Sequence, residues 1–294
     1  MNSSTAATES AGGSLAQDHL VVVPLDGTPN AERAIVPAMD LARRVGSMVR
    51  LVSAVEDDDE TESQLSYLRA TAAALHDPLE HTQPNVEVRT DPGVVSTLAD
   101  DRGHNTTVCM ATSASIFHLD HYTGSMAEKV VRRSHRPTVL VGPNVEDHTV
   151  LDVGRIVVSV DGSERSEMAV PIAMWCGAAL DVPVWLVQVF EPGRVEGLQK
   201  AVASGDAVDT AYLRNLAQEN HVDGVSVQWE NLHSRKPAHA LVEYAGDDGL
   251  LVMATHGRTG WSRLTMGSVT THVVKHAERP VIVTCPEGLV DEPD

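Results

Sequence analysis

The chain has 294 residues, of which 42% are hydrophobic but only 3% aromatic, and its formal net charge is −19. This length suits two domains of ordinary size, each with an aliphatic core. An acidic surface repels the phosphates of nucleic acids and of anionic membranes, so the charge argues against both as partners. No apolar run approaches the roughly 18 residues that a membrane-spanning helix needs.

The two ends of the chain and its cysteines favour the reducing cytoplasm. Residues 1–18 are rich in Ser, Thr, Ala and Gly and lack the basic and apolar regions of a signal peptide, which indicates a disordered tail. Residues 286–294 form a second, acidic tail. Cys109, Cys176 and Cys285 stand alone in apolar runs, as is typical of small buried side chains. We therefore expect a cytoplasmic protein.

The two halves of the chain repeat each other. Both contain an apolar strand that ends in Asp-Gly-Thr or Asp-Gly-Ser, then a Gly-Ser pair, then an Arg-Pro pair. In chain order these are 21–28 and 156–163, 124–125 and 267–268, 136–137 and 279–280. Repeated landmarks in a fixed order indicate tandem copies of one unit. We predict one domain over 19–142, a linker with Pro and Asn breakers over 143–154, and a second domain over 155–285.

Each copy alternates between predicted strands and helices. In the second copy we expect strands over 155–160, 184–190, 225–229, 250–254 and 280–284, and helices over 164–180, 207–220, 238–246 and 268–277. The first copy has the same order. This alternation predicts a parallel sheet with helices on both faces. Ligands of such sheets bind beyond the carboxyl ends of the strands where the strand order reverses, here between the first and fourth strands.

The residues that can carry chemistry follow the fourth predicted strand of the second copy. A loop between a buried strand and a helix N-terminus offers free N–H groups and the positive end of the helix dipole to a phosphate. Gly257 and Gly260 permit close approach of a ligand to the backbone. Arg258 and Arg263 add positive charge, while Ser268 and Thr270 add hydroxyl donors. Ordinary turn glycines are the alternative explanation of this pattern.

The spacing in this segment resembles the ATP-binding signature of universal stress proteins. That signature is glycine, two residues, glycine, nine residues, then glycine with Ser or Thr, after an apolar strand. Here Ala254 stands at the first glycine, Gly257 is the second, and Gly267-Ser268 follows after nine residues. The strand-Asp-Gly-Ser opening at 161–163 is also typical of that family. The resemblance covers both halves of the chain, as in tandem members of the family.

The resemblance implies two tandem doubly wound α/β domains, each a five-stranded parallel sheet flanked by four helices (adenine nucleotide α-hydrolase-like). It also implies ATP, with Asp161 near adenine and ribose, Val189 beside the adenine, and the glycine loop around ribose and phosphates. Alanine at position 254 costs little unless the backbone there needs a positive φ. The candidate ATP-binding residues are Ser159, Val160, Asp161, Val189, Ala254, Thr255, His256, Gly257, Arg258, Gly260, Gly267, Ser268, Val269 and Thr270.

The first copy departs further from the signature. Both glycines before the spacer are alanine, at Ala111 and Ala114. Its acidic loop 56–62 follows the second strand on the ligand side, where carboxylates would repel a triphosphate. We therefore expect a single ATP per chain. The weaker first-copy equivalents of the site are Asp26, Gly124 and Ser125. The loop residues His118, Asp120 and His121 lack the well-placed ligand set of a metal site, so no metal is predicted.

No catalytic residue is predicted. The sequence has no Gly-x-x-x-x-Gly-Lys phosphate loop, no Gly-x-Ser-x-Gly nucleophile elbow and no paired Cys/His motif. His256 is the only titratable group beside the proposed site that could act as a base, and packing against the loop explains it better. The leading hypothesis is an ATP-binding stress-response sensor or regulator. The alternatives are an interaction module without nucleotide, an enzyme that activates a substrate with ATP, and a protein that hydrolyses ATP slowly.

The last strand of each copy is a candidate for association between the halves. Open sheets leave edge strands with unpaired backbone groups, and 138–142 and 281–284 are short, apolar edge candidates. Pairing them would cover both edges in a pseudo-twofold arrangement, as the resembling family does between single domains. A dimer of whole chains and a downstream protein partner stay open. The expected seam residues are Val139, Val141, Val281 and Val283.

Overall fold

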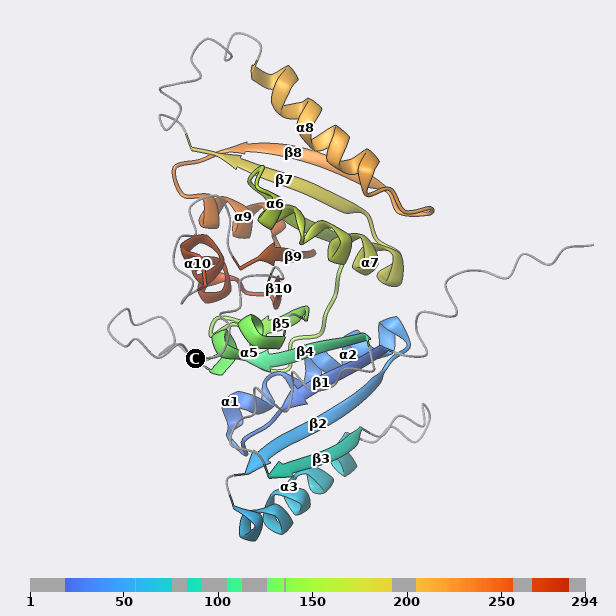
Figure 1. Ribbon diagram of the computed structural model, residues 1–294, viewed down its shortest axis with the longest axis vertical. Helices are drawn as coiled ribbons and strands as arrows, with labels where there is room; N and C mark the ends of the chain where they lie inside the picture. The colour runs from blue at the N-terminus through green and yellow to red at the C-terminus, as the bar shows by residue number, and fades with distance from the viewer. Residues whose placement is uncertain are drawn as a thin grey trace, which may run out of the picture.

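The computed structural model describes residues 19–55, 57–75, 84–90, 105–112, 126–134, 136–191, 205–255 and 266–285. Their ten strands form one sheet in the order β3-β2-β1-β4-β5-β10-β9-β6-β7-β8 (Figure 1). The first half contributes β1 (His19–Pro24), α1 (Pro29–Glu32), α2 (Ile35–Val45), β2 (Met48–Val55), the 3-10 helix η1 (Asp58–Glu60), α3 (Thr61–Ala74), β3 (Asn85–Thr90), β4 (Asn105–Ala111), α5 (Met126–Ser134) and β5 (Thr138–Val141). The second contributes β6 (Arg155–Val160), α6 (Glu164–Glu167), α7 (Val170–Leu180), β7 (Val184–Phe190), α8 (Gly205–Glu219), β8 (Val227–His233), α9 (Pro237–Ala245), β9 (Gly249–Ala254), α10 (Ser268–His276) and β10 (Val281–Thr284).

Each half has five parallel strands whose order reverses between its first and fourth strands. β1 pairs with β4, and β6 pairs with β9, as the sequence predicts. Alternate side chains of the strands enter buried clusters on opposite faces, because successive residues of a strand point to opposite sides. One cluster includes residues of α2, α3, α7 and α8, and the other includes residues of α5, α9 and α10. The result is a doubly wound α/β architecture with helical layers on both faces of the sheet.

Two predicted elements of the second half differ from the structure. The helix expected over 164–180 is broken into α6 and α7. Pro171 lies in the first turn of α7, where its missing N–H is tolerated but where it cannot continue a helix that began at 164. The strand expected over 225–229 instead runs along the whole of β7, from Val227 opposite Val184 to His233 opposite Phe190. Polar residues such as Glu230 join it because β8 is an edge strand.

The last strands of the two halves pair with each other, as expected for an internal pseudo-dimer. β10 runs antiparallel to β5, with Val281 opposite Leu140, Ile282 opposite Val139 and Val283 opposite Thr138. Val141, also expected at this seam, lies beyond these three pairs and is in register with Ala111 of β4. All residues of both strands are buried. In Figure 1 the two strands lie in the middle of the sheet, between the halves.

The segment 143–154 between the halves is packed against the first half. The Arg33 guanidinium donates from Nε to Asp147 at 2.8 Å and from Nη2 to the carbonyl of Val145. The N–H of Leu151 donates to Oδ2 of Asp40 at 3.0 Å. The side chains of Val145 and Leu151 are buried. These contacts make the predicted linker a fixed connection. Within the described ranges, no helix combines the length and the apolar character that crossing a membrane requires.

Candidate functional site

The candidate site lies at the carboxyl ends of β6 and β9. These neighbouring parallel strands are in register from Arg155 opposite Gly249 to Val158 opposite Val252. Asp161 follows the last residue of β6, and Thr255 follows the last residue of β9. Both residues therefore leave the sheet at the same edge, at the point where the strand order reverses. This is the position where doubly wound sheets bind their ligands.

A tight turn fixes the carboxylate of Asp161. Its Oδ1 accepts from the backbone N–H of Ser163 at 3.1 Å and from the Ser163 hydroxyl at 2.6 Å. The Ser163 hydroxyl oxygen also accepts from the N–H of Ser166 at 3.2 Å and thereby caps α6. Gly162 has a φ of 80°, which favours glycine at this position. The turn leaves Asp161 partly buried at the edge of the sheet.

The same turn opens the first half. Oδ1 of Asp26 accepts from the N–H of Thr28 at 2.9 Å and from its hydroxyl at 2.6 Å. Thr28 in turn accepts from the N–H of Ala31 at 3.2 Å, and Gly27 again has a φ of 80°. The sequence repeat is therefore a structural repeat at the start of each half. Asp26, unlike Asp161, is exposed.

The N-terminus of α10 faces the same edge of the second half. Gly267 is its N-cap, with φ −57° and ψ 148°, and as a glycine it has no side chain with which to cap the helix. The N–H of Gly267 donates to the carbonyl of Thr255 at 2.7 Å, which ties the start of the helix to the end of β9. Ser268 is exposed and Val269 is partly buried. The first N–H groups of a helix have no partner within it, so this end can receive an anion.

Thr270 points away from this helix end. Its side chain is 4% exposed, and its hydroxyl donates to the carbonyl of Ala254 at 2.9 Å. The sequence predicts a hydroxyl donor for phosphate at this position. The structure instead places Thr270 on the buried face of α10, where its hydroxyl holds the helix on the strand. Ser268 is thus the exposed hydroxyl of the first turn.

Alanine at the first signature position does not strain the backbone. Ala254 is the last residue of β9 and is buried. Among the described non-glycine residues, only His148 and Asp181 have a positive φ. Ala254 and its first-half equivalent Ala111 therefore adopt conformations that alanine tolerates. Their departure from glycine carries no conformational cost.

The remaining predicted residues fall into two groups. Val160 is buried, Ser159 is partly buried, and Val189 packs against the cluster that also contains Met253 and Met266. These three residues lie near the ends of β6 and β7, on the side of the sheet edge where the site is expected. The others lie outside the described residues: His256, Gly257, Arg258, Gly260, Ala114, His118, Asp120, His121, Gly124 and Ser125.

Two contacts at this edge were not predicted from the sequence. Glu128 of the first half accepts from the N–H of Met266, directly before α10, at 2.6 Å. Cys285, which follows β10, lies near Thr255 and Arg132 of α5. Burial raises the pKa of the Cys285 thiol, while a hydrogen bond with Thr255 and the charge of Arg132 oppose the increase. No local pattern reveals the contacts of Glu128 with Met266 and of Arg132 with Cys285, because both join the two halves across the β5–β10 seam.

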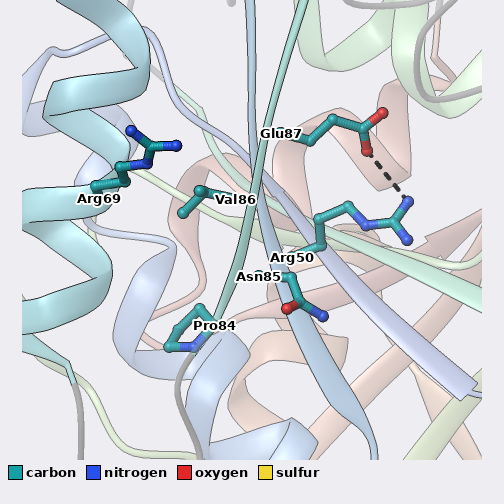
Figure 2. Close-up of a pocket in the computed structure, with 6 residues that line it drawn as sticks. All are labelled: Arg50, Arg69, Pro84, Asn85, Val86 and Glu87. Atoms are coloured by element: carbon teal, nitrogen blue, oxygen red, sulfur yellow. Dashed lines mark ion pairs between the residues drawn. The ribbon is translucent and has the colours of Figure 1, made fainter.

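An open cavity of about 840 Å³ lies elsewhere, at the outer edge of the first half. Arg50, near the start of β2, forms an ion pair with Glu87 at 3.2 Å, as Figure 2 shows. Pro84 and Asn85 place the cavity at the amino end of β3, whereas the candidate site lies at carboxyl ends of strands. This cavity is therefore separate from the candidate site. Its lining residues are Arg50, Arg69, Pro84, Asn85, Val86 and Glu87.

By architecture the chain is a tandem doubly wound α/β protein with an aspartate turn and a helix N-terminus at the switch point of its second half. The profile of the universal stress protein family matches residues 19–142 and 153–284. The chain therefore belongs to the universal stress protein family, with two such domains in tandem.

The individual relatives have low sequence identity to this chain. The chain is 31% identical to a universal stress protein of Methanocaldococcus jannaschii over 138 residues, which are 44% of this chain and 80% of the relative. It is 29% identical to one from Mycobacterium tuberculosis over 167 residues, 54% of this chain and 55% of the relative, so the match spans about half of that protein. The crystal structure of an Archaeoglobus fulgidus universal stress protein superposes with a TM-score of 0.63 at 16% identity, over 92% of this chain and 97% of the other. This last likeness concerns the fold alone.

Proposed function

We propose that the chain binds ATP at the carboxyl edge of its second half and acts as a nucleotide-dependent regulator or sensor in the stress response. The observation that carries this proposal is the position of α10. Its N-cap is a glycine, which has no side chain to cap the helix, and the N–H of that glycine is bonded to Thr255 at the edge where Asp161 leaves the sheet. An anion-binding helix end beside a fixed carboxylate suits a molecule with phosphates at one end and hydrogen-bond donors at the other. The two described ends of the segment that resembles the ATP signature, Ala254 and Gly267, lie at the same edge.

The first half is a poorer site for a triphosphate. Exposed Asp26 lies at its carboxyl edge, and the acidic η1 follows β2 at that edge. Tyr67 donates to Glu32 at 2.8 Å. Burial first, and then the hydrogen bond and charge of Glu32 and the charge of Asp26, raise the pKa of Tyr67 to about 12. These negative charges at the carboxyl edge of the first half would repel phosphates, which supports a single ATP held by the second half.

The alternative function is an interaction module that binds no nucleotide. Ala254 and Ala111 do not support this alternative, since neither residue strains its backbone. We therefore retain ATP binding as the proposal. A simple first observation is whether ATP co-purifies with the protein.

The first test removes the carboxylate of the proposed site. Asp161→Ala should lower the affinity for ATP at least about tenfold, because a charged partner of adenine or ribose is lost. Gly257→Asp should abolish binding, because the resemblance to the ATP signature assigns Gly257 to the phosphate loop, where an added carboxylate would repel the phosphates. The matched control is Asp26→Ala, which removes the same turn from the first half and should leave the affinity unchanged. Calorimetric titration with ATP measures all three, and unchanged affinity in both second-half variants would refute the site.

The second test counts the sites. The intact chain should bind a single ATP, because the acidic edge of the first half opposes phosphate binding. Equilibrium dialysis with labelled ATP at saturating concentration gives this ratio directly. Two equivalent sites per chain would contradict the assignment of ATP to the second half.

A further inference from the structure

A side chain of the first half forms a hydrogen bond with the segment that precedes α10 in the second half. The backbone N–H of Met266 donates to Oε1 of Glu128 at 2.6 Å. Glu128 lies in the first turn of α5 and is 9% exposed, and Met266 is equally buried. A hydrogen bond from an amide to a buried carboxylate is among the stronger hydrogen bonds in proteins. Met266 directly precedes Gly267, the N-cap of the helix whose end is proposed to hold phosphate.

Two successive amides before α10 are thereby fixed from two different directions. The N–H of Met266 is held by Glu128 of the first half, and the N–H of Gly267 is held by the carbonyl of Thr255 of the second half, at 2.7 Å. These two bonds set the direction in which the chain enters the helix. The orientation of the following N–H groups, from Ser268 onward, depends on that direction.

The carboxylate of Glu128 is held in place by the packing of α5. Ala127, Val130 and Val131 of this helix belong to one buried cluster with Val273 and Val274 of α10. Side chains on one buried face cannot move independently of one another without opening the core. The position of Glu128 relative to α10 is therefore set by the seam between the halves.

We propose that Glu128 is a positioning residue for the nucleotide site of the second half, and that the first half serves as a built-in partner that completes this site. The proposal rests on the proposed function. Glu128 does not touch the ligand: it bonds the amide before the N-cap, while the amides of the first turn are left for phosphate. Holding the chain at this point prepares the helix end for its ligand, so binding does not have to order it. The first half, without a nucleotide of its own, would then have a structural role in the site of the second half.

The test compares two substitutions of Glu128 with a neighbour on the same helix. Glu128→Ala removes the acceptor and should weaken ATP binding about tenfold. Glu128→Gln keeps an acceptor oxygen and should restore the affinity to within about threefold of the wild type. Lys129→Ala alters an exposed residue of α5 and should change nothing. Calorimetric titration of the full chain with ATP, below the unfolding temperature of every variant, gives these affinities.

Amide hydrogen exchange supplies a second measurement that needs no nucleotide. In Glu128→Ala, exchange at Met266 and in the first turn of α10 should rise, while exchange in β9 stays as in the wild type. If the wild type binds no ATP, the proposed function fails, and the positioning role fails with it. If the wild type binds ATP and Glu128→Ala binds it equally well, only the positioning role is overturned. Tighter binding by both Glu128 variants would also overturn it, because the carboxylate would then compete with phosphate.

Discussion

Replacing Gly142 by alanine is expected to destabilise the protein by about 3 kcal/mol, by forcing apart the packing between the halves. Gly142 follows β5 in the first half, and a Cβ added there would overlap the carbonyl oxygen of Val274 in α10. That atom belongs to the backbone of a helix, next to the buried side chain of Val274, so it cannot swing aside as a side chain could. Unfolding in urea, followed by circular dichroism, gives the change in the free energy of unfolding.

Gly224→Ala is the matched control for this experiment. Gly224 has a φ of 84° and nothing within 4 Å of the position of an added Cβ. Alanine there costs only the strain of a left-handed backbone, about 1 kcal/mol. If Gly142→Ala costs no more than Gly224→Ala, the close approach between the halves does not contribute to stability as described.

The strands of this fold could be predicted from the sequence with little error. β6, β7 and β9 are mostly apolar, with Arg155, Ser159 and Gln188 as polar exceptions, because a parallel strand covered by helices on both faces buries both of its faces. The strand predicted over 225–229 begins two residues before β8 and ends four residues before the end of β8, because an edge strand needs no such run. Its polar residues, among them Glu230 and Asn231, interrupt the apolar pattern that would predict a strand, although β8 pairs with β7 along its entire length.

The candidate site could be predicted only in part. The turn at Asp161 depends on three consecutive residues and was visible in the sequence. The inward direction of Thr270 has a signal in the sequence, because Thr270, Val273, Val274 and Ala277 recur at helical spacing on one face, and all four are buried. The contact of Glu128 with Met266 had none, because it depends on the pairing of β5 with β10. A pattern within one segment does not encode a contact that another segment creates.

His19 is expected to make the protein less stable as the pH falls below 6.5. The residue begins β1 and is 2% exposed. Its Nε2 lies 3.1 Å from Oγ1 of Thr107, and its ring lies against Trp175 of α7, with 4.9 Å between the ring centroids. Burial lowers the pKa of His19 from 6.5 to about 4. The imidazole is therefore neutral in the folded protein at neutral pH, in the contact between the halves.

The sign of the effect follows from this lowered pKa. Between pH 6.5 and about 4 the unfolded chain binds a proton at His19 that the folded protein excludes, so unfolding is favoured as the pH falls. The contribution of His19 is complete above pH 6.5 and is lost by about pH 4, below which both states are protonated. Its full size is about 3 kcal/mol, at 1.36 kcal/mol for each unit of pKa difference.

The measurement is the free energy of unfolding in urea at pH 7.5 and at pH 4.5, for the wild type and for His19→Gln. The amide can still bond to Thr107 but does not titrate, so the variant should lose about 2.5 kcal/mol less than the wild type between the two pH values. Carboxylates titrate over the same range, and they contribute equally to both proteins and cancel in the comparison. The exposed His221→Gln serves as the control and should follow the wild type. Equal losses in the wild type and His19→Gln would mean that His19 binds its proton equally well in the folded and the unfolded protein, and that its buried place against α7 is wrong.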